Sequence, residues 1–273
     1  ASQKRINEFL QLEPDITSSN AEEPVFDGKI SFKNVSFTYP DTGIEALREV
    51  SFEVEKGQFV AIIGRTGSGK STLANLIMRM YDTDAGQIEI DGKELRNLNL
   101  NNFRNQIGFV PQEVFLFSDT IKNNIAFGLS SVKEGQVEQA AKDAAVYNNI
   151  IDFDLKFETM LGERGITLSG GQKQRVSIAR ALIKEPKILI FDDCLSAVDT
   201  KTEEEILSNL GKIMKGKTSI LIAHRISTIK NADKILVLDD GKIIEQGTHD
   251  ELLANNGAYA EMYDNQLLEE ENR

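Results

Sequence analysis

A glycine-rich run at residues 64–71, GRTGSGKS, has the residue types and spacing that hold a phosphate chain. It follows the apolar stretch FVAII and opens a segment with helical periodicity. Glycines at such a junction let backbone N–H groups turn toward an anion, and the helix N-terminus adds a partial positive charge. We therefore predict that Lys70 contacts the β- and γ-phosphates of a nucleotide and that the Ser71 hydroxyl faces Mg²⁺. The nucleotide-binding residues expected here are Gly64, Arg65, Thr66, Gly67, Ser68, Gly69, Lys70, Ser71 and Thr72.

Two adjacent carboxylates end the apolar stretch at residues 188–193, ILIFDD. A carboxylate that closes a buried strand is the usual second contributor to a Mg²⁺ site when a phosphate loop lies upstream. Mg²⁺ keeps several waters and needs few protein oxygens, so Ser71 and Asp192 are sufficient. Asp193 is then predicted to face the γ-phosphate and its attacking water. An Asp192 that only caps the strand end is the alternative, and the upstream loop favours the metal role.

A second glycine-rich run at residues 168–175, LSGGQKQR, precedes another helical segment. Ser169 is suited to cap that helix and to do nothing more. Gly170 and Gly171, however, let the backbone approach an anion closely. Two phosphate-binding helix starts exceed what one nucleotide requires from a single chain. The pattern therefore indicates a site that is completed by another copy.

The elements that must position these residues alternate between strands and helices. After the phosphate loop, Leu73, Leu76, Ile77 and Met80 recur on one side of a predicted helix. The alternation predicts an α/β fold with a mostly parallel sheet, short antiparallel strands near the start and a helical subdomain over about 114–185. The predicted strands are 30–39, 49–57, 59–64, an edge hairpin at 87–95, 107–112, 187–193, 218–225 and 234–240.

Composition narrows the function classes. The 273 residues carry a formal net charge of -12, which argues against a nucleic-acid partner, because such a partner needs clustered Lys and Arg. The single cysteine, Cys194, excludes an internal disulfide and is interpreted as a small buried apolar residue. No apolar run is long enough to span a bilayer, and no signal peptide is recognised. Residues 1–24 are interpreted as a linker and 25–273 as one domain, and the missing initial Met suggests a fragment.

The chain resembles the nucleotide-binding domain of an ATP-binding cassette (ABC) transporter from about residue 28 to residue 265. GRTGSGKS resembles the Walker A loop, ILIFD resembles the Walker B strand, and LSGGQ matches the family signature letter for letter. Gln112, in VPQE, resembles the Q-loop residue, and His224, in IAHR, resembles the switch histidine. The run SAVD at 196–199 resembles the D-loop. The resemblance implies an ATPase with a P-loop core, an antiparallel β subdomain and an inserted helical subdomain.

Other segments resemble exporters within that family. These are TMLGERG at 159–165, which includes Glu163 and Arg164, and the tail that follows residue 241. RINEFLQLEP resembles the tether that leaves the last membrane helix, which implies a membrane domain upstream and a location at the cytoplasmic face of the cell membrane. Tyr39, in FTYP, resembles the aromatic residue that stacks on adenine; packing on the core is its alternative.

The resemblance also implies a mechanism. Two such domains pair head to tail, and ATP bound by one Walker loop is covered by the signature of the other. The γ-phosphate of that ATP is expected to meet Ser169, Gly170, Gly171 and Gln172 of the second domain. Gln112 is expected to sense Mg²⁺ or water and to report to the membrane domain. His224 is expected to orient the attacking water.

One residue departs from the family pattern, because Asp193 stands where Glu is usual. The shorter arm predicts slow hydrolysis with ATP binding little affected, since misplacement by ~1 Å can cost on the order of 10²-fold in rate. The predicted catalytic residues are Asp193, His224 and Gln112. Three alternatives stay open: a weakly hydrolysing half of a heterodimeric exporter, a homodimer that tolerates Asp or an engineered Asp, and a soluble ABC ATPase that acts on DNA or ribosomes. A regulatory module that binds ATP without any turnover is the limiting case of the first alternative, the weakly hydrolysing half.

Overall fold

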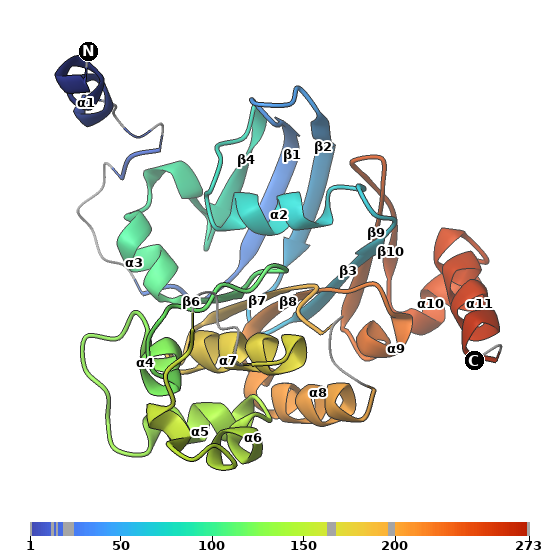
Figure 1. Cartoon of the computed structure of the whole chain (residues 1–273). Helices are drawn as coiled ribbons and strands as arrows, with labels where there is room; N and C mark the ends of the chain where they lie inside the picture. Colours follow the sequence, from blue (N-terminus) through green and yellow to red (C-terminus); the bar gives the residue numbers. More distant parts are fainter. Residues whose placement is uncertain are drawn as a thin grey trace.

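The computed structural model of this chain describes residues 2–11, 14, 16–18, 25–162, 168–195 and 200–271. Within these residues the main sheet has six strands in the order β10-β9-β3-β8-β7-β6 (Figure 1). Neighbours from β9 to β6 pair in parallel, whereas β10 runs antiparallel to β9. The strands are Phe59–Gly64 (β3), Ile107–Val110 (β6), Ile188–Asp192 (β7), Thr218–Ile222 (β8), Lys234–Asp239 (β9) and Lys242–Gly247 (β10).

The central strands are apolar on both faces because helices cover both sides. Every residue of β7 and of β8 is buried, as expected for a parallel sheet between two helical layers. Figure 1 shows α2 above the sheet and α7 and α8 below it. The helices are Lys70–Ile77 (α2), Gly170–Leu182 (α7) and Thr200–Met214 (α8).

An antiparallel sheet packs over the other side of α2. Its order is β2-β1-β4-β5, and its strands are Ile30–Thr38 (β1), Glu45–Val54 (β2), Ala85–Ile90 (β4) and Lys93–Glu94 (β5). Phe32 and Phe52 stack across the β1–β2 pair with ring centroids 4.5 Å apart. One apolar cluster joins this sheet, α2 and the main sheet. The α/β fold with an antiparallel sheet is therefore confirmed.

Helices occupy the long stretch between β6 and β7. They are Ile121–Ala126 (α4), Gln136–Asp143 (α5), Tyr147–Ile151 (α6), a 3₁₀ turn at Lys156–Glu158 (η2), and α7. Arg180 of α7 ties this layer together, because its guanidinium donates to the carbonyls of Asn124 and Phe115 at 2.8 and 2.9 Å. Burial lowers the pKa of Arg180 to about 10.

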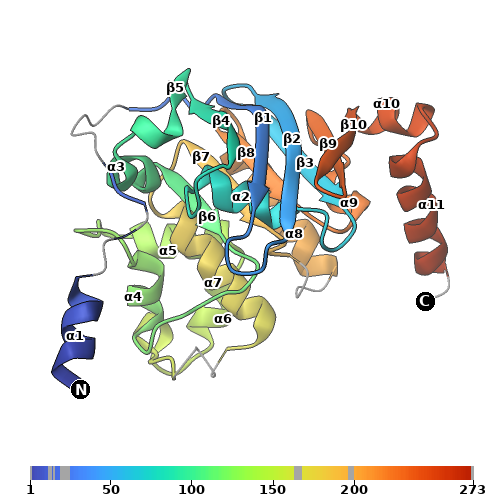
Figure 2. The ribbon, with the colours of Figure 1, turned by 90° about the horizontal axis from the view of Figure 1, so that it is seen from above.

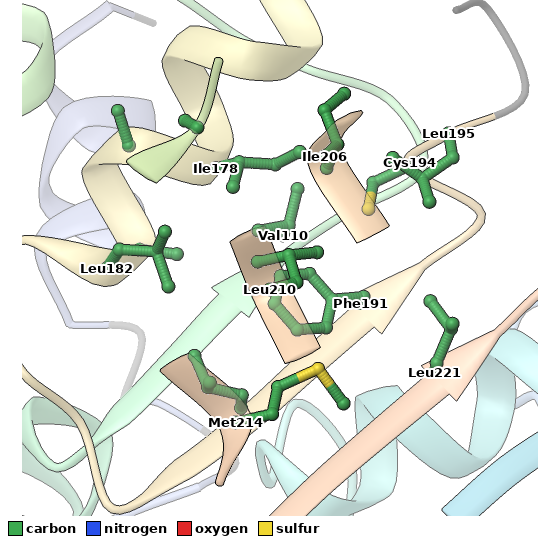
Figure 3. Packing of buried hydrophobic residues seen from close by; sticks show 14 of the residues in the cluster. Val110, Ile178, Leu182, Phe191, Cys194, Leu195, Ile206, Leu210, Met214 and Leu221 are labelled. Atoms are coloured by element: carbon green, nitrogen blue, oxygen red, sulfur yellow. The ribbon is translucent and has the colours of Figure 1, made fainter. Parts of the chain in front are cut away.

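The lower core packs α7 and α8 against β6 and β7. Figure 3 shows Val110, Phe191 and Leu210 at its centre, with Ile178 beside them. Cys194 lies at the edge of this cluster and is buried, which confirms the apolar role predicted for it. Burial raises the pKa of its thiol well above the usual range, so the sulfur stays protonated.

The remaining elements lie at the periphery. Figure 2 shows α1 and α11 on opposite sides of the molecule. Residues 1–24, predicted as a linker, are described only in part. None of the helices in the described part of the chain has the length and apolar character that a membrane span requires. The peripheral elements are Ser2–Leu10 (α1), Leu95–Asn97 (η1), Leu100–Asn105 (α3), Ile226–Ile229 (α9), His249–Ala254 (α10) and Ala258–Glu271 (α11).

Candidate functional site

The phosphate loop connects the end of β3 to the start of α2. Gly69 precedes the helix with φ +101°, and a Cβ at this position lies 2.5 Å from the carbonyl oxygen of Ala46, so only glycine fits. Lys70 is buried, and its Nζ donates to the carbonyls of Gly64 and Arg65 at 2.8 Å each. Burial lowers the pKa of Lys70, and the nearby charges of Asp193 and Asp192 oppose that shift. The loop thus holds a cation beside the backbone N–H groups that open α2.

The Ser71 hydroxyl donates to Oδ1 of Asp192 at 3.0 Å, which joins the start of α2 to the end of β7. Asp192 is 4% exposed. Burial raises the pKa of its carboxyl, and the hydrogen bond from Ser71 opposes that shift. Among the residues described, no three His, Cys, Asp or Glu side chains gather in a metal-binding cluster. One hydroxyl and one carboxylate still fit Mg²⁺, which retains waters and uses substrate phosphates as ligands.

Three further polar side chains meet where neighbouring parallel strands end. Nε2 of Gln112, after β6, donates to Oδ2 of Asp193 at 3.4 Å. Nε2 of His224, after β8, lies 3.8 Å from the same oxygen. Asp193 itself follows β7 with φ 45°, and its N–H donates to the carbonyl of Ile222 at 3.0 Å. The carboxyl ends of parallel strands are where open α/β sheets bind ligands.

These groups share one cleft. The cleft has a volume of ≈ 290 Å³. The sequence-based interpretation missed Ile44, Ala46 and Ile222 as lining residues, because apolar residues next to a turn or at a strand end give no local signal of a site. The lining residues are Tyr39, Ile44, Ala46, Thr66, Gly67, Gly69, Lys70, Ser71, Thr72, Gln112, Asp192, Asp193, Ile222 and His224.

Tyr39 packs on its neighbours, which is the alternative given for it above, and it also lines the cleft. Its hydroxyl lies 3.0 Å from Oγ1 of Thr72, the third residue of α2. Its ring also packs edge-on against Phe37 and Tyr81, with centroids 5.0 and 5.4 Å away. The ring is therefore held by aromatic neighbours where it lines the cleft.

The signature run lies apart from that cleft. Ser169 caps α7: its hydroxyl accepts from the Gln172 N–H at 3.2 Å, and its own N–H donates to Oε1 of Gln172 at 3.0 Å. None of the described residues 168–172 lines the cleft. Because the Ser169 hydroxyl accepts in the cap, its proton can be donated outward. A single chain therefore does not bring its two glycine-rich helix starts together.

Two predicted segments lie outside the described residues. These are 196–199, compared above with the D-loop, and the part of TMLGERG that contains Glu163 and Arg164. The description resumes at Thr200, the start of α8, after the first of these segments and at Leu168 after the second.

A family model described as "ABC transporter" matches residues 47–196, which span the phosphate loop, Gln112, the signature and Asp192–Asp193. The chain belongs to the ABC transporter family. The match confirms the predicted family and places an ATP-binding ATPase domain in this chain.

Similar proteins include a flippase and a multidrug resistance transporter by name. An ATP-dependent lipid A-core flippase of Pseudomonas fluorescens (strain Pf0-1) is 49% identical over 263 residues, 96% of this chain and 44% of that protein. The "Probable multidrug resistance ABC transporter ATP-binding/permease protein YheI" of Bacillus subtilis (strain 168) is 47% identical over 272 residues, 98% of this chain and 46% of that protein. The chain thus spans less than half the length of these relatives.

A solved structure, of a bacterial Atm1-family ABC exporter with ATP bound, matches the fold closely. The TM-score is 0.92 with 43% sequence identity, over 97% of this chain and 46% of that one. This similarity extends over nearly the whole chain and therefore includes both sheets and the helical layer.

Proposed function

We propose that this chain is the ATP-hydrolysing motor domain of an ABC exporter, located at the cytoplasmic face of a membrane. ATP-driven pairing of two such domains would power transport through a membrane domain. The observation that carries the proposal is the convergence of Lys70, Ser71 and Asp192 with Gln112, Asp193 and His224 on one cleft. The flippase and multidrug-transporter names of relatives that extend well beyond this chain support the link to transport.

The phosphate loop binds and orients the triphosphate. Lys70 exchanges its two carbonyl partners for β- and γ-phosphate oxygens, and the N–H groups at the start of α2 donate to the same chain. Tyr39 and Ile44 offer an aromatic ring and an apolar edge to the adenine. Mg²⁺, held by Ser71 and Asp192 with Gln112 nearby, would neutralise charge on the phosphate oxygens.

The polar group beyond the phosphates acts on water. The Asp193 carboxylate accepts a proton from, or polarises, the attacking water. His224 lies across from it and orients the water and the γ-phosphate. Gln112 donates to Asp193 and therefore connects the state of this site to the start of the helical layer, which is next to the expected membrane domain.

A second copy of the domain, identical or related, would complete the site. The signature run of one chain lies outside its own cleft. This supports a role in covering ATP on a partner for Ser169, Gly170, Gly171 and Gln172. ADP lacks the phosphate that this run would contact. ATP would therefore favour the paired state and hydrolysis would release it.

Phosphate release from ATP, measured over a range of chain concentrations, tests the proposal. The rate per chain is expected to rise with concentration, because two chains form each site. A rate that is zero at every concentration would contradict the ATPase, and a rate per chain independent of concentration would contradict the paired site.

Ser169→Asp separates the cap of α7 from the role proposed for it across the interface. Asp caps a helix about as well as Ser, so the melting temperature is expected to stay near that of the wild type. The new carboxylate would face the γ-phosphate on the partner, and turnover is expected to fall ~10-fold or more through like-charge repulsion. Calorimetry and phosphate release measure the two effects.

Thr248→Asp is the matched control, because Thr248 forms the same capping box with Glu251 at the start of α10. It is expected to retain wild-type turnover. Equal losses in both variants, or none in Ser169→Asp, would remove Ser169 from the interface.

Asp193→Glu tests the effect of the short side chain. The extra methylene is expected to raise kcat by ~10- to 10²-fold with little change in KM. It extends the carboxylate by roughly the ~1 Å of misplacement that can cost a catalytic group on the order of 10²-fold in rate. Steady-state kinetics provides the measurement. Unchanged or slower turnover would show that the geometry of the cleft is already matched to Asp.

A low-turnover regulatory half of a heterodimeric exporter is the second candidate. The observation that favours it is the Asp193 side chain, which is 12% exposed and has a shorter arm than the usual Glu. Single-turnover hydrolysis with the chain in excess over ATP distinguishes the two: slow but complete conversion supports the motor, and bound, unconverted ATP supports the regulatory half.

A further inference from the structure

The last helix, α11, is fixed to the body of the domain by polar contacts at its start. The Glu245 carboxylate of β10 accepts from the N–H groups of Ala258 and Tyr259 at 2.6 and 3.2 Å. Tyr259 is fully buried, and its hydroxyl lies 2.8 Å from Nδ1 of His249. These contacts set the direction in which α11 leaves the sheet (Figure 2).

One face of α11 continues from this anchor toward the catalytic loop. Tyr259, Met262, Tyr263 and Gln266 are spaced by three, four and seven residues, which places them on one side of a helix. Met262 and Tyr263 pack against the lower core. Gln266 is the next residue on that face and reaches the loop that follows β8.

The amide of Gln266 contacts the backbone on both sides of Arg225. Its Nε2 donates to the carbonyl of His224 at 2.6 Å, and its Oε1 accepts from the N–H of Ile226 at 2.8 Å. Ile226 is the first residue of α9, and Arg225 provides no side-chain cap there. Gln266 therefore satisfies one of the N–H groups that a helix start leaves without an intrahelical partner.

The same loop is held from the other side by α8. Nη1 of Arg225 donates to Oε2 of Glu203 at 2.6 Å, and the Thr228 hydroxyl donates to Oε1 of Glu203 at 2.5 Å. Glu203 is buried. This second anchor holds Arg225 and α9, whereas Gln266 alone among these contacts bonds to the backbone of His224 itself.

We propose that Gln266 is a positioning residue for ATP hydrolysis, through which α11 fixes the backbone of His224 so that its imidazole faces Asp193 and the γ-phosphate. The proposal rests on the function proposed above. It assigns the C-terminal helix a task in the chemistry: a displacement of α11 would release His224 without altering the phosphate loop. A Gln266 that only attaches α11 to the domain is the competing explanation.

Gln266→Ala and Gln266→Met test the proposal in the full chain, with Asn265→Ala, an exposed neighbour on the same helix, as the control. Met keeps the length and packing of Gln but removes both hydrogen bonds. We expect kcat to fall ~10-fold in both Gln266 variants with KM within ~3-fold of the wild type, because displacement of a catalytic group acts on the rate step. Amide exchange at Ile226 is expected to accelerate in both. Asn265→Ala is expected to match the wild type in every measurement.

A double-mutant cycle with His224→Ala decides whether Gln266 acts through the histidine. In the His224→Ala background, Gln266→Met is expected to cause no further loss of kcat. Two results would overturn the proposal and leave the proposed function intact, provided that the wild type hydrolyses ATP. One is a further ~10-fold loss of kcat when Gln266→Met is added to His224→Ala. The other is an unchanged kcat in Gln266→Ala and Gln266→Met alone. A wild type without hydrolysis would refute the proposed function and with it this role of Gln266.

Discussion

Asp193→Asn is expected to lower the kcat for ATP hydrolysis by ~10- to 10²-fold, because general-base assistance is usually worth ~10²–10⁴-fold and the short arm of Asp193 already forfeits part of it. Asn has nearly the shape of Asp, so the cleft keeps its form while the group that accepts a proton is lost. The amide also cannot accept equally well from Gln112, which lies 3.4 Å from the present carboxylate. ATP affinity is expected to stay within a few-fold of the wild type, because Asp193 is placed to act on water and the phosphate loop carries the binding.

Phosphate release and nucleotide titration measure these two quantities. Asp152→Asn, an exposed position on the helical layer, provides the control for loss of one negative charge. Turnover within ~3-fold of the wild type in Asp193→Asn would show that another group assists the water, and Asp193 would then lose its catalytic assignment.

Lys70→Met is expected to weaken ATP binding by roughly 10²-fold or more. Hydrogen bonds to charged groups contribute about 1.5–3 kcal/mol each, and Lys70 is proposed to contact two phosphates. The free energy of unfolding is not expected to fall. Burial lowers the pKa of Lys70, so keeping its amine charged in the folded state costs stability at neutral pH. That cost is relieved only as the pH rises to the usual range of lysine. Met fills the space without that cost.

Isothermal titration and thermal unfolding test both halves of this expectation. Lys93→Met, on the exposed edge strand β5, is expected to change neither ATP affinity nor melting temperature. An ATP affinity that is not reduced in Lys70→Met would contradict the proposed role of residues 64–71 in binding phosphate, and with it the proposed nucleotide site.

Local signals predicted the parts of the site that depend on local structure. The strand, the glycine loop and the helix around Lys70 follow one another in the chain, so their arrangement is nearly fixed by backbone chemistry. The Ser71–Asp192 contact joins residues far apart in sequence, yet it too was predictable, because parallel strands deliver their last residues to one edge. The Ser169 cap followed from the preference of helix starts for hydroxyl side chains.

The predicted bounds of helices and strands were wrong where tertiary contacts, rather than the hydrophobic periodicity of the sequence, set the end or the start of an element. Met80 was expected on the buried side of α2, but the helix ends at Ile77 and Met80 is 45% exposed. Arg79 adopts φ 48° and turns the chain, and its buried guanidinium binds Asp82 at 2.9 Å. The second strand begins at Glu45 rather than at 49, because Thr38 of β1 supplies a pairing partner for Glu45.

The contact of Gln266 with the His224 loop had no signal in the sequence. A glutamine on a terminal helix is typical of a solvated face, and its partners here are main-chain groups, which carry no residue identity. Such contacts become visible only when the tertiary structure places a polar side chain against a loop.

The way in which Lys70 is held has a consequence for selectivity among cellular salts. Because its ammonium already bonds to two carbonyls of its own loop, a chloride or a free phosphate ion that binds beside it must displace those carbonyls and offers few contacts in return. A triphosphate bound as proposed would replace both carbonyls at once and would also contact the start of α2, Ser71 and the aromatic ring of Tyr39. Under the proposed function, abundant small anions would therefore compete poorly with a nucleotide for this loop.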